Sequence, residues 1–213
     1  MADIIGTNAS NSLDDKFTFG VPGFRTDKIA GLEGNDTILI TDGNDTVFGG
    51  SGNDTITDGK HPLFGSGDDQ IFGEGGNDRI IAGEGSDTIN GGDGIDTIDY
   101  SLSTSGVSVH LGSTGAQSGG LAAGDRLSFI ENLIGTGFGD TLTGSTDNNQ
   151  IFGNNGRDRI SGDAGHDTLD GGNGNDTISG GTGNDQVFGG ADRDSISGGA
   201  GADRVVAGSG NDT

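Results

Sequence analysis

The stretch Gly171–Ser179, which reads GGNGNDTIS, is the clearest copy of a nine-residue unit that recurs along most of the sequence. The unit has the pattern Gly-Gly-x-Gly-x-Asp-x-U-x, in which U is a large aliphatic residue. In the last third of the chain its aspartates are Asp158, Asp167, Asp176, Asp185, Asp194, Asp203 and Asp212. The aliphatic residues two positions later are Ile160, Leu169, Ile178, Val187, Ile196 and Val205. Self-similarity at a fixed period predicts a fold built by stacking one small unit many times.

The composition is unusual for a protein that folds on its own. The 213 residues include 47 Gly, only 28% are hydrophobic, and the formal net charge is −23. Low hydrophobicity with high net charge normally predicts disorder, because too little apolar surface is available to offset chain entropy. Of the 33 acidic residues, however, only four are Glu, and the aspartates are spaced singly among glycines. This spacing favours an ion that neutralises the acids and supplies the missing stability.

Several classes of function are disfavoured by the same composition. The negative charge would repel nucleic acids and anionic membrane surfaces. The chain has no Cys, so it holds neither disulfides nor thiolate metal sites. The first residues, MADII, carry no cleavable secretion signal, and no apolar run is long enough to insert into a membrane. The three histidines lie far apart without metal-binding spacing, so we expect no transition-metal site.

The sequence divides into four segments. Residues 1–30 contain degenerate repeats and an expected N-terminal cap, because Phe17, Phe19 and Val21 alternate as in a strand. Residues 31–98 form a first array of repeats with a phase break at 58–66, which we expect to be a distorted loop. Residues 99–139 form an inserted segment of strands and loops. Residues 140–213 form a second array that is truncated in mid-repeat, which indicates a fragment or a covered end.

Each unit is expected to fold as a turn followed by a short strand. Glycines permit the positive φ angles of the turn, and β-branched residues suit the strand. Two units make a coil of eighteen residues, so each unit stacks on the unit two places further along. Stacked strands lie about 4.8 Å apart, which brings the aspartates of successive coils into range of one shared ion.

Without a cation this stacking would align rows of carboxylates. Two such charges about 5 Å apart repel each other by a few kcal/mol at the effective dielectric constant of a protein surface. Ca²⁺ takes six to eight oxygen ligands with flexible geometry, whereas Mg²⁺ demands a stricter octahedron. We therefore predict several Ca²⁺ ions as cofactors. The predicted metal ligands are Asp36, Asp45, Asp54, Asp69, Asp78, Asp87, Asp96, Asp140, Asp158, Asp167, Asp176, Asp185, Asp194, Asp203 and Asp212.

In the pattern and spacing of these residues, the chain resembles the RTX (repeats-in-toxin, haemolysin-type calcium-binding) family. The resemblance covers about two thirds of the chain, where the units keep phase. It implies an all-β fold, a right-handed parallel β-roll with two repeats per coil, whose folding is driven by Ca²⁺. It also implies type I secretion from a bacterium and an extracellular location. Bridging pairs carried over from the family are 36/54, 69/87, 78/96, 140/158, 158/176, 167/185, 176/194, 185/203 and 194/212, with a weaker pair at Asn149 and Asp167.

The acids of the inserted segment and the wider function are less tightly constrained. Asp125 and Glu131 could bind a further ion, but solvated loop acids are the favoured interpretation. No nucleophile–base pair is visible, so we expect no enzymatic activity in this chain. Two alternatives to a calcium-driven folding module are an accessory carrier of a fused enzyme, toxin or adhesin domain, and a structural or adhesive β-roll that self-associates end to end.

Overall fold

The computed structural model describes residues 3–5, 12–14, 26–40, 43–59 and 67–213. Within these ranges the chain consists of strands and turns with one short 3-10 helix, η1 (Gly120–Ala122). It divides into two compact units. The N-terminal unit contains Met1–Asp99, Thr114–Ala116 and Ala122–Ile130, and the C-terminal unit contains Tyr100–Ser113, Gln117–Leu121 and Glu131–Thr213. The expected capping strand at Phe17–Val21 and most of the loop at the phase break lie outside the described residues.

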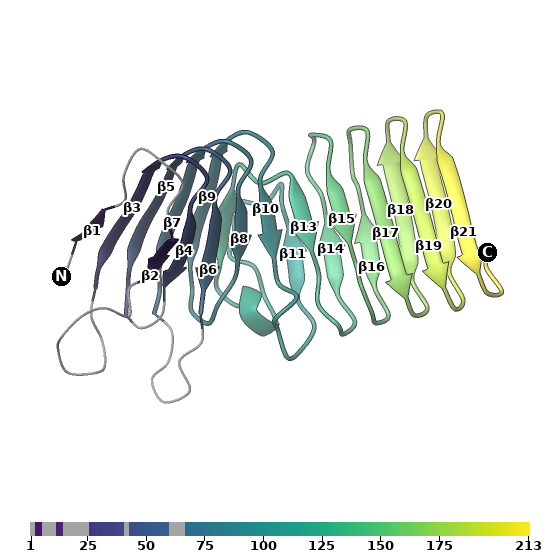
Figure 1. Ribbon diagram of the computed structural model, residues 1–213. Helices are drawn as coiled ribbons and strands as arrows, with labels where there is room; N and C mark the ends of the chain where they lie inside the picture. The colour runs from purple at the N-terminus through teal and green to yellow at the C-terminus, as the bar shows by residue number, and fades with distance from the viewer. Residues whose placement is uncertain (1–2, 6–11, 15–25, 41–42, 60–66) are drawn as a thin grey trace. The chain divides into compact units, whose positions relative to one another are not determined.

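The N-terminal unit contains two parallel sheets (Figure 1). The first sheet consists, in spatial order, of β1 (Asp3–Ile5), β3 (Lys28–Glu33), β5 (Thr46–Ser51), β7 (Gln70–Gly75), β9 (Thr88–Asp93) and β12 (Arg126–Ser128). The second sheet consists of β2 (Ser12–Asp14), β4 (Thr37–Ile40), β6 (Thr55–Asp58), β8 (Arg79–Ile81) and β10 (Thr97–Asp99). Successive strands therefore alternate between the two sheets, as the expected two units per coil require.

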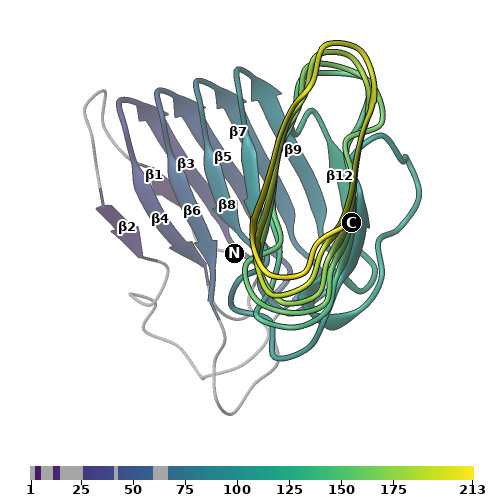
Figure 2. The same ribbon diagram turned by 90° about the vertical axis from the view of Figure 1, so that its right-hand side faces the viewer.

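The C-terminal unit repeats this arrangement, and its coils overlie one another when the stack is viewed end-on (Figure 2). One sheet contains β13 (Asn132–Ile134), β15 (Gln150–Phe152), β17 (Thr168–Asn173), β19 (Gln186–Ala191) and β21 (Arg204–Ser209). The other contains β11 (Ser108–His110), β14 (Thr141–Thr143), β16 (Arg159–Ser161), β18 (Thr177–Thr182) and β20 (Ser195–Ala200). All strand pairs are parallel, which confirms the predicted β-roll.

Register follows the eighteen-residue coil. Leu169 pairs with Val187, and Ile178 pairs with Ile196, so the aliphatic residue of each unit lies beside that of the next coil. These ladders form the core. Its fully buried members in the N-terminal unit include Ile29, Val47, Ile71 and Ile89 on one face and Ile38, Ile56, Ile80 and Ile98 on the other, and in the C-terminal unit Leu133, Ile151, Leu169 and Val187. One aliphatic side chain per unit makes a narrow core, so little apolar area stabilises each coil.

Candidate metal centres

The structure gathers the predicted ligand aspartates into columns. Each of these aspartates except Asp212 immediately precedes a strand, and strand pairing places it beside its counterpart in the adjacent coil. Thirteen of the predicted ligands are buried, with at most 4% of their surface exposed: Asp36, Asp45, Asp54, Asp69, Asp78, Asp87, Asp96, Asp140, Asp158, Asp167, Asp176, Asp185 and Asp194. Asp203 and Asp212 are half-buried.

One carboxylate oxygen of each aspartate fixes the stacking. The backbone N–H of Asp158 donates to Oδ1 of Asp176 at 2.9 Å, and the N–H of Asp176 donates to Oδ1 of Asp194 at 2.9 Å. The same bond recurs in every column, at 2.7–3.1 Å. Hydrogen bonds to an ionised acceptor are stronger than neutral ones. The side chain therefore specifies the register as well as offering a ligand.

The second oxygen, Oδ2, is left over by this arrangement. It is buried and accepts no hydrogen bond within the described residues at Asp54, Asp78, Asp87, Asp158, Asp167, Asp176, Asp185 and Asp194. Leaving a buried acceptor unsatisfied costs about 1–3 kcal/mol, and more for a charged group. An orphaned atom that recurs at the same place in successive coils requires a partner that binds oxygen.

The first glycine of the unit creates space beside that oxygen. A Cβ added to Gly171 would lie 2.5 Å from Oδ2 of Asp176 and 2.7 Å from the carbonyl oxygen of Gly189 in the next coil. Gly153 has the same surroundings, at 2.5 Å from Oδ2 of Asp158 and 2.7 Å from the carbonyl oxygen of Gly171. A carboxylate oxygen and a backbone carbonyl oxygen therefore converge where any side chain would obstruct them.

Burial also changes the acidity of the columns. Desolvation, together with the charges of Asp140 and Asp176, raises the pKa of Asp158 to about 7, against the lowering effect of the N–H of Asp140. Desolvation likewise raises the pKa of Asp78 and Asp167 to about 6. At a spacing of about 5 Å, like charges repel by roughly 3 kcal/mol at an effective dielectric constant near 20. A cation within each column would remove this penalty.

The donor set fits a hard divalent cation. It offers carboxylate and carbonyl oxygens without nitrogen or sulfur, which is the chemistry that Ca²⁺ prefers. The column aspartates and the carbonyls beside the first glycine of each unit would hold the ion. When bound, the ion would neutralise the stacked carboxylates and supply a partner for Oδ2.

All of the expected pairs of stacked aspartates lie side by side, including Asn149 with Asp167. The structure adds pairs that the spacing did not predict. The phase break lengthens one coil to twenty-four residues without breaking the columns, because the N–H of Asp45 donates to Asp69 and that of Asp54 donates to Asp78. Asp27 also joins the first column, since its N–H donates to Oδ1 of Asp45 at 2.8 Å.

The inserted segment contains hidden repeat units. Asp125 is fully buried, and its Oδ1 accepts the N–H of Asp87 at 3.0 Å, so the interpretation of Asp125 as a solvated loop acid is wrong. The reason is that β12 pairs with β9, which aligns Leu127 with Ile89 and puts Asp125 in the column. The sequence Asp125-Arg126-Leu127-Ser128 fits Asp-x-U-x and could have revealed this. Glu131, which is half-buried, precedes β13 in the corresponding place.

Asn149 satisfies its place in a column differently. Its Oδ1 accepts the N–H of Ser145 at 2.7 Å, and its Nδ2 donates to the carbonyl oxygen of Glu131 at 2.8 Å. The amide therefore uses its hydrogen-bonding groups within the protein. It leaves neither a charge nor an orphaned oxygen for an ion.

Comparison with known proteins identifies the repeat. The family model described as the RTX calcium-binding nonapeptide repeat (4 copies) matches residues 23–56, 65–98, 134–169, 153–187, 161–196 and 179–213, which is more than half of the chain. No curated protein matches the chain significantly. Among the described residues, no helix is long and apolar enough to cross a membrane. The columns of buried aspartates and the matched repeats together establish that this chain is a calcium-binding β-roll of the RTX nonapeptide repeat family.

Proposed function

We propose that this chain is a folding module that Ca²⁺ switches on outside the cell, within a bacterial protein exported by a type I pathway. The observation that carries the proposal is the recurring Oδ2 oxygen, buried without a hydrogen bond in successive coils. The buried carboxylates of such a roll repel one another and destabilise it until an ion binds them. The column aspartates named above are the proposed ligands.

Mass action converts these sites into a switch. Extracellular Ca²⁺-binding modules have dissociation constants around 10⁻⁴–10⁻³ M. At a tenfold excess of Ca²⁺ over that constant, each site adds about 1.4 kcal/mol to stability. Several sites that share aspartates along a column would bind cooperatively. The chain would then remain unfolded where Ca²⁺ is scarce and become rigid where it is millimolar.

Export and attachment are the finer parts of this proposal, and family membership supports them. RTX repeats typify secreted bacterial proteins. A chain that stays unfolded in the cell suits passage through an export channel. In this proposal any catalysis or target binding belongs to a domain attached to the roll, while the roll supplies calcium-dependent rigidity.

Differential scanning calorimetry tests the proposal directly. We expect a cooperative unfolding transition in millimolar Ca²⁺ and its loss in chelator, with Mg²⁺ at the same concentration failing to restore it. An identical melting temperature in Ca²⁺ and in chelator would refute the calcium switch.

A further inference from the structure

Two buried acids in the N-terminal unit, Asp58 and Asp99, do not belong to any column, and Asp99 forms an ion pair with Arg79. Asp58 is the last residue of β6, where the unit elsewhere has its first glycine, as at Gly49 and Gly73. The side chain at this place points into the core. Ile40, which pairs with Asp58 in the adjacent strand, is fully buried, and only 2% of Asp58 is exposed. An aspartate therefore occupies a position that glycine or an apolar residue fills in the neighbouring coils.

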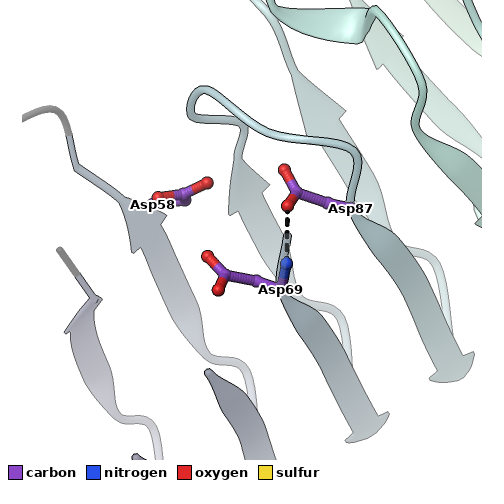
Figure 3. Close-up of side chains that lie close together, drawn as sticks. All are labelled: Asp58, Asp69 and Asp87. Atoms are coloured by element: carbon purple, nitrogen blue, oxygen red, sulfur yellow. Dashed lines mark hydrogen bonds between the residues drawn. The ribbon is translucent and has the colours of Figure 1, made fainter. Parts of the chain in front are cut away.

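Asp58 points at two column aspartates (Figure 3). Asp58, Asp69 and Asp87 each place one carboxylate oxygen within 4.8 Å of the other two. Both oxygens of Asp58 are buried and accept no hydrogen bond from the described residues. Oδ2 of Asp87 is likewise buried and accepts no hydrogen bond from them. Oδ1 of Asp87 accepts the N–H of Asp69 at 2.9 Å, which holds these two carboxylates in place.

The surroundings of Asp58 disfavour its ionised form in the absence of a cation. Desolvation, together with the charges of Asp69, Asp87, Asp125 and Asp45, raises the pKa of Asp58 to about 9. Gly83 approaches it from the next coil, since a Cβ there would lie 2.2 Å from the Asp58 carboxyl carbon. This carboxylate accepts none of the hydrogen bonds by which the described residues join one coil to the next; those bonds run between backbone groups or end on column aspartates and loop side chains. Burying this carboxyl is therefore unfavourable, and within the described part of the chain no hydrogen bond compensates for it.

We propose that Asp58, Asp69 and Asp87 together hold a hard divalent cation, with Ca²⁺ the ion expected outside the cell, in a site with three carboxylates inside the N-terminal unit. A column aspartate ordinarily meets a glycine at this point, so Asp58 adds a third negative ligand that the repeat pattern does not provide. The number of charged ligands and the rigidity of the site set affinity for Ca²⁺. This site is therefore the tightest in the chain and the first to fill.

Because Asp69 and Asp87 also belong to a column, the inference rests on the proposed function. The test uses the full chain and isothermal titration with Ca²⁺, together with the metal content after dialysis against limiting Ca²⁺. Asp58→Gly restores the usual residue of the repeat. Asp58→Asn keeps the volume and removes the charge. Asp93→Asn, an exposed acid outside the columns, controls for the loss of one negative charge.

We expect the wild type to show one site whose dissociation constant is at least tenfold lower than those of the others. Asp58→Gly should lose that site, Asp58→Asn should weaken it, and Asp93→Asn should retain it. If Asp58→Gly fails to fold in millimolar Ca²⁺, Asp58→Asn decides the matter. Unchanged binding in the Asp58 variants, or an equal loss in Asp93→Asn, would overturn the inference while leaving the columns intact. A wild type that binds no Ca²⁺ would overturn the proposed function as well.

Discussion

The substitution Asp176→Asn should change the stability of the roll in opposite directions with and without Ca²⁺. Asp176 lies between Asp158 and Asp194 in its column, and its Oδ1 accepts the N–H of Asp158. Asparagine preserves that acceptor because its own oxygen can take the place of Oδ1. What it removes is the negative charge and the orphaned Oδ2. The substitution therefore changes the charge of the column while keeping the hydrogen bond that sets its register.

The size of the change in stability follows from the charges of the two neighbouring aspartates, Asp158 and Asp194. Each pair of like charges about 5 Å apart costs roughly 3 kcal/mol at an effective dielectric constant near 20. Partial protonation relieves some of this, because desolvation raises the pKa of Asp176. We therefore expect Asp176→Asn to stabilise the calcium-free roll by about 2 kcal/mol. With Ca²⁺ bound, two sites lose a charged ligand, and a tenfold loss of affinity at each removes about 3 kcal/mol of binding free energy. After the gain in the calcium-free state is subtracted, the variant should be less stable than the wild type in Ca²⁺ by about 1 kcal/mol.

Two equilibrium assays measure these effects. In Ca²⁺, the midpoint of urea unfolding should fall. In chelator, folding can be driven with trimethylamine N-oxide, which strengthens effective burial, and the variant should need less of it than the wild type. Asp147→Asn, an exposed acid outside the columns, should leave both midpoints near the wild-type values. Destabilisation of the same size in both conditions would refute the reasoning, because it would mean that Asp176 acts through packing and not through charge.

Three further predictions follow from single features of the columns. Asn149→Asp should add a Ca²⁺ site detectable by titration, yet destabilise the chelated roll, since it loses the bond to Glu131; unchanged Ca²⁺ binding would contradict this. The backbone of Asp192 has a φ of 78°, a conformation that costs a non-glycine residue about 1 kcal/mol. Asp192→Gly should therefore raise the urea midpoint with and without Ca²⁺. An unchanged midpoint would show that Asp192 is not strained. Burial raises the pKa of Asp158 to about 7, so the folded chelated roll binds more protons than the unfolded chain between about pH 4 and 7. The stability of the chelated roll should therefore fall as pH rises from 5 to 8, so that more osmolyte is needed to fold it. A stability that increases with pH would contradict the raised pKa of Asp158.

The sequence was sufficient to predict the regular parts of the roll. A constant spacing of nine residues determines which residue stacks on which, so the pairing of Leu169 with Val187 and of Asp176 with Asp194 required no structure. The alternation within each short strand also determined which residue is buried. These features depend on local periodicity, and local periodicity is visible in one sequence.

The features that escaped prediction depend on contacts across interruptions. The pairing of Asp45 with Asp69 spans twenty-four residues, and that of Asp87 with Asp125 spans thirty-eight. Once the period is broken, the length of an intervening loop gives no information about which unit resumes the column. Asp58 escaped for a different reason. It replaces a glycine in an irregular unit, and the repeat pattern gives no sign that its carboxylate lies close to Asp69 and Asp87.

The central claim is that Ca²⁺ folds this chain by neutralising its aspartate columns. The decisive experiment is far-ultraviolet circular dichroism during a Ca²⁺ titration, with Mg²⁺ as the control and ionic strength held constant. We expect a cooperative change from coil to β-structure with Ca²⁺ alone, at submillimolar to millimolar concentration. A β-sheet spectrum already present in chelator and unaltered by Ca²⁺ would contradict it, because the buried carboxylates would then be tolerated without an ion.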